Sequence, residues 1–225
     1  MVYSTQAQLN YTYSGTITHD GTGLAGVQLS CVVVGFPGST SSTTSDENGH
    51  YSFTVSAGAS GTITPSLAGY NFDPTNHLFV SAVQDLDTLD FIADRVPLKI
   101  SGLLTVDGNP LPGATVYLSG SLIDSVTSDL TGAYEFTVSY GGTYTVTPQK
   151  SGYTFTPISN LFPAITGDQV FNFTAAINTL TVSGVITLDG NGLSGVTVHL
   201  TGSNNDSLVT DHTGQYSFSV GAGGY

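Results

Sequence analysis

The chain has 225 residues and a net charge of −13, with three Lys or Arg residues against sixteen Asp or Glu residues. A surface this acidic repels phosphate backbones and anionic lipid headgroups, which argues against nucleic-acid binding and electrostatic membrane docking. The sequence contains no run of about 18 apolar residues, so we also expect no membrane insertion.

One motif occurs three times along the chain. Asp-x-x-Gly-x-Tyr-x-Phe begins at Asp46, at Asp129 and again at Asp211. Self-similarity at a nearly constant spacing, here about 80 residues, indicates tandem copies of one structural unit. We therefore predict four parts, which are an N-terminal extension (1–10), two complete modules (11–96 and 97–178) and a truncated third module (179–225).

In the extension the side chains at odd-numbered positions form one set and those at even-numbered positions another. This alternation predicts an amphipathic strand that has no partner strand within the extension. One hypothesis is that this strand is donated to the third module of another copy, which would give a head-to-tail polymer. The residues expected to serve assembly are Tyr3, Thr5, Ala7, Leu9 and Tyr11. The alternative is that the chain is a cut or partly traced piece of a longer repeat protein.

Each module is predicted to open with an alternating strand that ends in a tight hairpin. The turns contain Asp20-Gly21, Asp107-Gly108 and Asp189-Gly190, and Asp-Gly favours the positive φ that two-residue hairpins require. In the first module the next strand places Val27, Leu29 and Cys31 on one face. We therefore interpret Cys31, the single cysteine, as a small buried hydrophobic residue.

The repeated motif is expected to form a turn followed by the aromatic centre of each module. Its Asp can accept the backbone N–H two residues further on, and its Gly supplies a left-handed conformation. Tyr51 and Phe53 then share one strand face, as do their counterparts. Later strands are expected around Ile63–Pro65, Leu78–Phe79 and Leu89–Ile92, with counterparts such as Val170–Phe173 in the second module.

Seven short strands per module and no helical periodicity predict an all-β fold of tandem antiparallel Greek-key sandwiches. The segments between modules, Ala93–Pro97 and Ala175–Thr179, are too short to act as flexible tethers. We therefore expect a stiff, elongated rod.

The order SGxxxxDGxxLxG, then DxxGxYxF, then TxTPxxxGYxFxP resembles the carboxypeptidase regulatory-like and CnaB-like repeats. This resemblance implies transthyretin-like sandwiches of secreted or surface-anchored prokaryotic proteins, where they serve as stalks, spacers, filament subunits or accessory domains. It also implies an isopeptide bond in some modules, and only the second module has the residue types, Lys99, Glu135 and Asn172. Because Lys99 alternates with Leu98 and Ile100, we expect it to face solvent instead.

The densest group of acidic residues contains Asp85, Asp87 and Asp90. Several oxygen ligands converging on one point would suit calcium, so these residues are the metal candidates. The alternative is a solvated acidic edge that discourages aggregation between sheets. We expect no catalytic group and no cofactor elsewhere, because neither the histidines nor the glycines have the spacing of a known site.

These features predict a non-enzymatic extracellular protein, a surface filament subunit or an adhesin stalk that assembles head to tail. The alternative is carbohydrate-binding or spacer modules of a secreted polysaccharide-active protein. For a surface glycan the only candidate loop aromatics are Tyr140 and Phe36, and Asn205 is the candidate glycosylation site.

Overall fold

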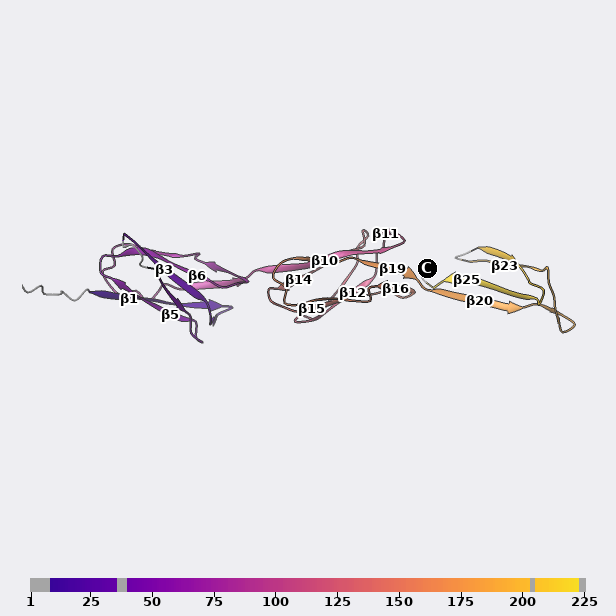
Figure 1. Cartoon of the computed structure of the whole chain (residues 1–225), viewed down its shortest axis with the longest axis horizontal. Coiled ribbons are helices and arrows are strands. Elements are labelled where there is room, and N and C mark those ends of the chain that lie inside the picture. Colours follow the sequence, from indigo (N-terminus) through magenta and orange to yellow (C-terminus); the bar gives the residue numbers. More distant parts are fainter. Residues whose placement is uncertain (1–8, 36–39, 203–204, 223–225) are drawn as a thin grey trace, which may run out of the picture. The chain divides into compact units, whose positions relative to one another are not determined.

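The computed structural model describes residues 9–35, 40–202 and 205–222, and all regular structure in these ranges is β-strand (Figure 1). The predicted all-β fold is confirmed. None of the described residues forms a helix that could cross a membrane. The chain divides into two compact units, residues 1–97 and 98–225. The expected boundary between residues 178 and 179 falls inside the second unit and stays a prediction.

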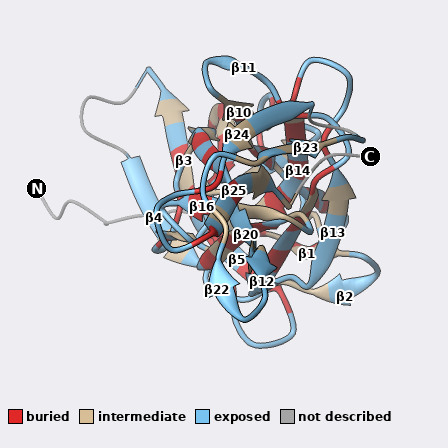
Figure 2. Cartoon of the chain, turned by 90° about the vertical axis from the view of Figure 1, so that its right-hand side faces the viewer, coloured by how far each residue is buried: buried red, intermediate tan, exposed pale blue. Residues whose placement is uncertain are grey.

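The first unit is a sandwich of two sheets. One sheet contains β1 (Asn10–His19), β2 (Thr22–Gly23), β5 (His50–Ser56), β7 (Tyr70–Asp73) and β9 (Phe91–Arg95). The other has the order β4 (Thr40–Thr44), β3 (Gln28–Val34), β6 (Ser60–Ser66), β8 (His77–Phe79). Buried and exposed positions alternate along the strands (Figure 2), and the buried side chains of both sheets form one core.

The second unit begins with the same arrangement. Its first sheet contains β10 (Pro97–Val106), β11 (Asn109–Pro110), β14 (Ala133–Ser139), β16 (Tyr153–Thr156), β18 (Gln169–Val170) and β19 (Phe173–Ile177). Its second sheet has the order β13 (Asp124–Thr127), β12 (Thr115–Gly120), β15 (Tyr144–Gln149), β17 (Asn160–Phe162).

The third repeat is described as three strand pairs. They are β20 (Thr179–Val185) with β25 (Gln215–Gly221), β21 (Thr187–Leu188) with β22 (Asn191–Gly192), and β23 (Thr197–Leu200) with β24 (Asp206–Val209). Val182 is 43% exposed, whereas Tyr13 and Ile100 at the matching positions are 3% and 0% exposed. In the first two repeats, strands after the aromatic motif cover this face, and the described part of the third repeat has no counterpart of them.

The prediction of a wholly antiparallel sandwich is wrong for the last strand of the first and second repeats. β9 runs parallel to β1, with Ile17 opposite Phe91, and β19 runs parallel to β10, with Leu104 opposite Phe173. Both last strands also begin later than expected. The physical reason for the error is that alternation along a strand sets which face a side chain occupies but not the direction of a strand relative to a neighbour distant in sequence. Because the first and last strands share a direction, the chain leaves each complete repeat at the end opposite to the one where it entered.

The hairpin turns and the lone cysteine are as predicted. Asp20, Asp107 and Asp189 each adopt a φ of 50° ahead of a glycine, and the residues that flank each Asp-Gly pair face one another across the hairpin. Cys31 is 1% exposed, and burial raises the pKa of its thiol.

A tyrosine hydroxyl ties the aromatic centre to the end of each complete repeat. Tyr134 donates a hydrogen bond to the carbonyl of Phe171 (2.7 Å), and Tyr51 does the same to the carbonyl of Leu89. This contact requires a glycine on the first strand, because a Cβ at Gly102 would lie 1.7 Å from the Phe171 oxygen. Burial raises the pKa of both tyrosines, which therefore remain hydrogen-bond donors.

A buried hydroxyl just before the Asp of the motif closes a second contact in all three repeats. In the second repeat Ser128 accepts the N–H of Ala114 (2.9 Å) and donates to the carbonyl of Leu111 (2.8 Å). Ser45 and Thr210 make the corresponding pair of bonds. The Ser-Asp or Thr-Asp dipeptide was visible in the sequence, but its role was not recognised there.

Replacing the motif tyrosine by phenylalanine tests the contact with the carbonyl. We expect Tyr134→Phe to lower the free energy of unfolding by about 1–3 kcal/mol, because it leaves a partly buried carbonyl without its donor. Tyr216→Phe is the matched control, since no such bond from Tyr216 occurs among the described residues of the third repeat. Urea denaturation followed by intrinsic tyrosine fluorescence measures both variants. Equal effects at the two sites would contradict the assignment.

The Asp of the motif makes stability depend on pH. A hydrogen bond from the Thr131 hydroxyl, followed by bonds from backbone N–H groups, lowers the pKa of Asp129. A carboxyl whose pKa is lower in the folded state stabilises fully above the unfolded value of about 3.9 and loses this contribution as the pH falls through the folded value. We therefore expect the melting temperature to fall on acidification below about pH 4.

The variant Asp129→Asn keeps an acceptor oxygen and removes the charge. Its melting temperature should depend less on pH between about pH 5 and 2 than that of the parent chain. The control Asp87→Asn removes an equal charge from an exposed residue. It should leave the fall of the melting temperature at acidic pH as it is in the parent chain. If the melting temperature of Asp129→Asn fell at acidic pH as steeply as that of the parent chain, this role of the turn would be contradicted.

Candidate functional site

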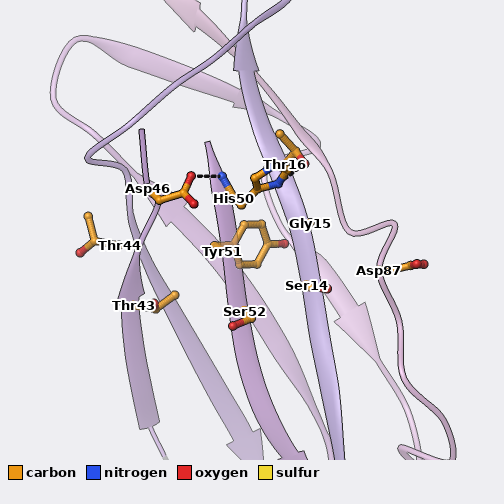
Figure 3. Close-up of a pocket in the computed structure, with 10 residues that line it drawn as sticks. All are labelled: Ser14, Gly15, Thr16, Thr43, Thr44, Asp46, His50, Tyr51, Ser52 and Asp87. Carbon is orange, nitrogen blue, oxygen red and sulfur yellow. Dashed lines mark hydrogen bonds between the residues drawn. The ribbon is translucent and has the colours of Figure 1, made fainter. Parts of the chain in front are cut away.

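An open groove of about 560 Å³ lies in the first repeat (Figure 3). Its walls come from β1, β4, β5 and the segment between β8 and β9. The lining residues are Ser14, Gly15, Thr16, Thr43, Thr44, Asp46, His50, Tyr51, Ser52 and Asp87. Hydroxyl groups, one imidazole and two carboxylates therefore dominate the lining.

The strands and the motif turn position the polar side chains of this groove. Thr16 and His50 are opposite each other on β1 and β5, and the Thr16 hydroxyl lies 3.0 Å from Nδ1 of His50. Asp46 accepts the N–H groups of His50 and Asn48 through Oδ1, both at 2.9 Å. These hydrogen bonds lower the pKa of Asp46, so this carboxylate is charged at neutral pH. The Tyr51 ring is buried and offers no exposed face for stacking.

A groove of about 660 Å³ occupies the same place in the second repeat. It shares Ser101, Gly102, Thr127, Asp129 and Tyr134 with the first groove at matching positions. Four further positions differ in chemistry, with Leu103, Val126, Ala133 and Val170 in place of Thr16, Thr43, His50 and Asp87. Glu135 stands in place of Ser52, and Asn172 also lines the second groove. The two grooves therefore have the same framework and different linings.

The structure does not bring the predicted calcium ligands together. Asp85 accepts the N–H of Thr12 and Asp90 that of Thr16, both at 2.7 Å, so these carboxylates bind the outer edge of β1. Asp87 lines the groove, but its carboxylate points away from Asp46 (Figure 3). Within the described ranges no group of three His, Cys, Asp or Glu side chains could hold a metal ion.

The counterparts in the second repeat show that these carboxylates act as hydrogen-bond acceptors. Asp168 accepts the N–H of Lys99 and Asn172 that of Leu103, both at 2.8 Å. Because the neutral Asn172 fills the place of Asp90, charge is not required there.

The residue types of an isopeptide bond are present but are not arranged for one. The Lys99 side chain is 54% exposed and forms an ion pair of 2.7 Å with Glu135, which is 52% exposed. Asn172 uses its amide oxygen on β10, as described above. The expected solvent-facing lysine is confirmed, and its bond with Glu135 raises its pKa.

The assembly candidates fall only partly within the described residues. Tyr3, Thr5 and Ala7 lie outside them. The carbonyl of Leu9 accepts the N–H of Ala57 (2.8 Å), and Tyr11 packs against the core of its own repeat. Tyr11 and the Leu9 backbone therefore have partners within the first repeat, and their role in assembly remains a proposal.

The two surface candidates for glycans are also placed only in part. Asn205 is exposed, and its amide oxygen accepts the N–H of Gly202 (3.3 Å). Tyr140 is 37% exposed, and Phe36 lies outside the described residues. Sequence reasoning missed the groove itself, and the signal that could have found it is the set of positions at which the aligned repeats differ.

A curated relative of this chain is the chitinase ChiA of Flavobacterium johnsoniae. The two are 31% identical over 156 residues, which is 67% of this chain and 10% of the chitinase. The chain therefore spans about a tenth of the length of the curated relative it matches.

A solved structure shows the same fold. The Bacillus anthracis TIE protein matches 95% of this chain and 44% of its own chain, with 16% identity and a TM-score of 0.72. The shaft pilin SpaA of Lactobacillus rhamnosus GG matches 75% of this chain and 98% of the pilin, at 12% identity and a TM-score of 0.33. The second score is too low for that match to bear on the fold.

The family assignment comes from the second repeat. Residues 99–175 match the carboxypeptidase regulatory-like domain family, and this range runs from the first strand of the repeat to its last. The other two repeats carry the same turn, glycine and aromatic motifs. The second repeat therefore matches the model of the carboxypeptidase regulatory-like domain family, which its motifs resemble.

Proposed function

We propose that the chain is a non-catalytic structural segment of an extracellular protein, a stalk whose repeats act as stiff spacers. The observation that carries this proposal is the joint between repeats. A single residue, Val96, separates β9 from β10, and a single residue, Asn178, separates β19 from β20. Connections this short leave few backbone torsions free between one repeat and the next.

Each joint residue is also hydrogen-bonded to the repeat that precedes it. Val96 donates its N–H to the carbonyl of Gly69 (2.9 Å), and Asn178 donates to the carbonyl of Gly152 (2.8 Å). The acceptors are matching glycines of the Gly-Tyr-x-Phe segment. The same joint is thus built twice from the same parts, which supports a role that depends on regular spacing.

The chemistry of the acidic residues supports the same role. The motif carboxylates accept turn N–H groups, and Asp85 and Asp90 accept N–H groups of a strand edge. These side chains contribute to the framework, which favours a structural role over a catalytic one.

Head-to-tail assembly into a surface filament is the more specific form of this proposal. The exposed apolar positions Leu180 and Val182 of the third repeat support it, because a strand from another copy could cover them. The N-terminal extension remains the proposed donor, with no nucleic acid and no membrane as partner.

A second candidate role is a spacer or carbohydrate-binding segment of a secreted polysaccharide-active protein. The similarity to the chitinase over two thirds of this chain favours it. Both candidates place the chain outside the cell and require repeats held at a set spacing.

Distance measurements between spin labels test the stiffness of the joint. Labels at Ser66 and Gln149, exposed residues of the first and second repeats, are introduced after the buried Cys31 is changed to Val. We expect a narrow, single-peaked distance distribution by double electron–electron resonance. Inserting Gly-Gly-Ser-Gly-Gly-Ser after Val96 should broaden it, because the added residues free the joint.

The matched control places the same insertion between Leu122 and Ile123, in an exposed loop of the second repeat. This control should keep the narrow distribution. A broad distribution in the chain without any insertion would contradict the spacer proposal.

A further inference from the structure

The grooves of the first two repeats differ in a way that the fold does not require. Four positions that carry Thr16, Thr43, His50 and Asp87 in the first groove carry aliphatic residues in the second. The corresponding strands of the third repeat have Val185 and Leu208 where the first has Thr16 and Thr43. Aliphatic side chains are therefore compatible with this sandwich, so folding does not require the polar lining of the first groove.

The polar atoms of the first groove are only partly used by the protein. His50 contacts Thr16 through Nδ1, and among the described residues nothing bonds to its Nε2. Asp46 accepts both of its hydrogen bonds through Oδ1, and its Oδ2 has no protein partner in the described ranges. The Ser52 hydroxyl likewise has none there. One fixed acceptor, one imidazole nitrogen and several hydroxyls therefore remain available to a ligand.

The chemistry of the lining decides the class of ligand. No Lys or Arg lines the groove and the chain carries a net charge of −13, which disfavours an anion. A metal ion would need several converging oxygen ligands, whereas Asp46 already uses one oxygen and Asp87 points away. A neutral ligand with many hydroxyl groups can both donate to Asp46 and accept from the threonines.

We propose that the groove of the first repeat, around Thr16, Asp46 and His50, binds a neutral oligosaccharide. The groove is open, so a glycan chain can lie along it without entering a closed cavity. Because the Tyr51 ring is buried and cannot stack on a sugar, hydrogen bonds alone hold the ligand, and we expect a Kd on the order of 1 mM. Tyr140 is not among the lining residues of this site, which goes beyond the spacer role and does not need it.

The test is a titration of the full chain followed by amide chemical shifts in nuclear magnetic resonance. Three neutral tetrasaccharides serve as probes, those of β-1,4-linked N-acetylglucosamine, glucose and xylose, each up to about 10 mM, ten times the expected Kd. We expect at least one probe to shift the amides of Thr16, His50 and Ser52 in a saturable way. The amides of Leu103 and Ala133, in the second groove, are the internal reference and should not move.

The decisive variant gives the first groove the side chains of the second. Thr16→Leu, Thr43→Val and His50→Ala together introduce residues that this fold already carries at the same positions. We expect the triple variant to keep the amide spectrum of a folded chain and to lose at least tenfold in affinity. The control Thr64→Val changes an exposed threonine of β6 outside the groove, and it should bind as the parent does.

Three results would overturn the proposal. They are no saturable shift with any of the three probes, equal shifts in both grooves, and unchanged binding by the triple variant. The spin-label distances at the joint are measured without sugar, so failure of the oligosaccharide site and failure of the spacer role can be told apart.

Discussion

One hydrogen bond in each complete repeat fixes where the segment before the last strand meets the first strand. The motif tyrosine reaches over the glycine of the first strand and donates to a carbonyl just before the last strand, at Leu89 or Phe171. That carbonyl can approach only because Gly15 or Gly102 has no Cβ. The contact holds the end of the repeat against its first strand, so the last strand lies parallel to the first and leaves at the opposite end.

Much of this fold could be predicted because its signals are local. Asp-Gly turns, alternating strands and the buried Cys31 each depend on a few neighbouring residues, and the structure has them as expected. The parallel pairing of Ile17 with Phe91 could not be predicted in the same way, because the two residues are distant in sequence and their register depends on the tyrosine contact. The same distance explains why the last strands were placed too early.

The candidate site was harder to predict than the fold. Aligning the repeats draws attention to what they share, and shared residues such as Asp46 and Tyr51 proved to be parts of the framework. The groove becomes visible only where the repeats differ, at Thr16 and His50, once the structure shows that these positions line one surface. In tandem repeats of one fold, shared residues thus report on folding, and diverged residues on a single surface point to binding.

The central claim is that the glycine, the carbonyl and the tyrosine act as one unit, and a double-mutant cycle tests it most directly. Gly102→Ala would displace the Phe171 carbonyl and break the bond from Tyr134, so each substitution alone removes the same contact. We expect the free energies of unfolding to be non-additive, with Gly102→Ala costing less in a Tyr134→Phe background by about 1 kcal/mol or more. Strict additivity of the two substitutions would contradict the account.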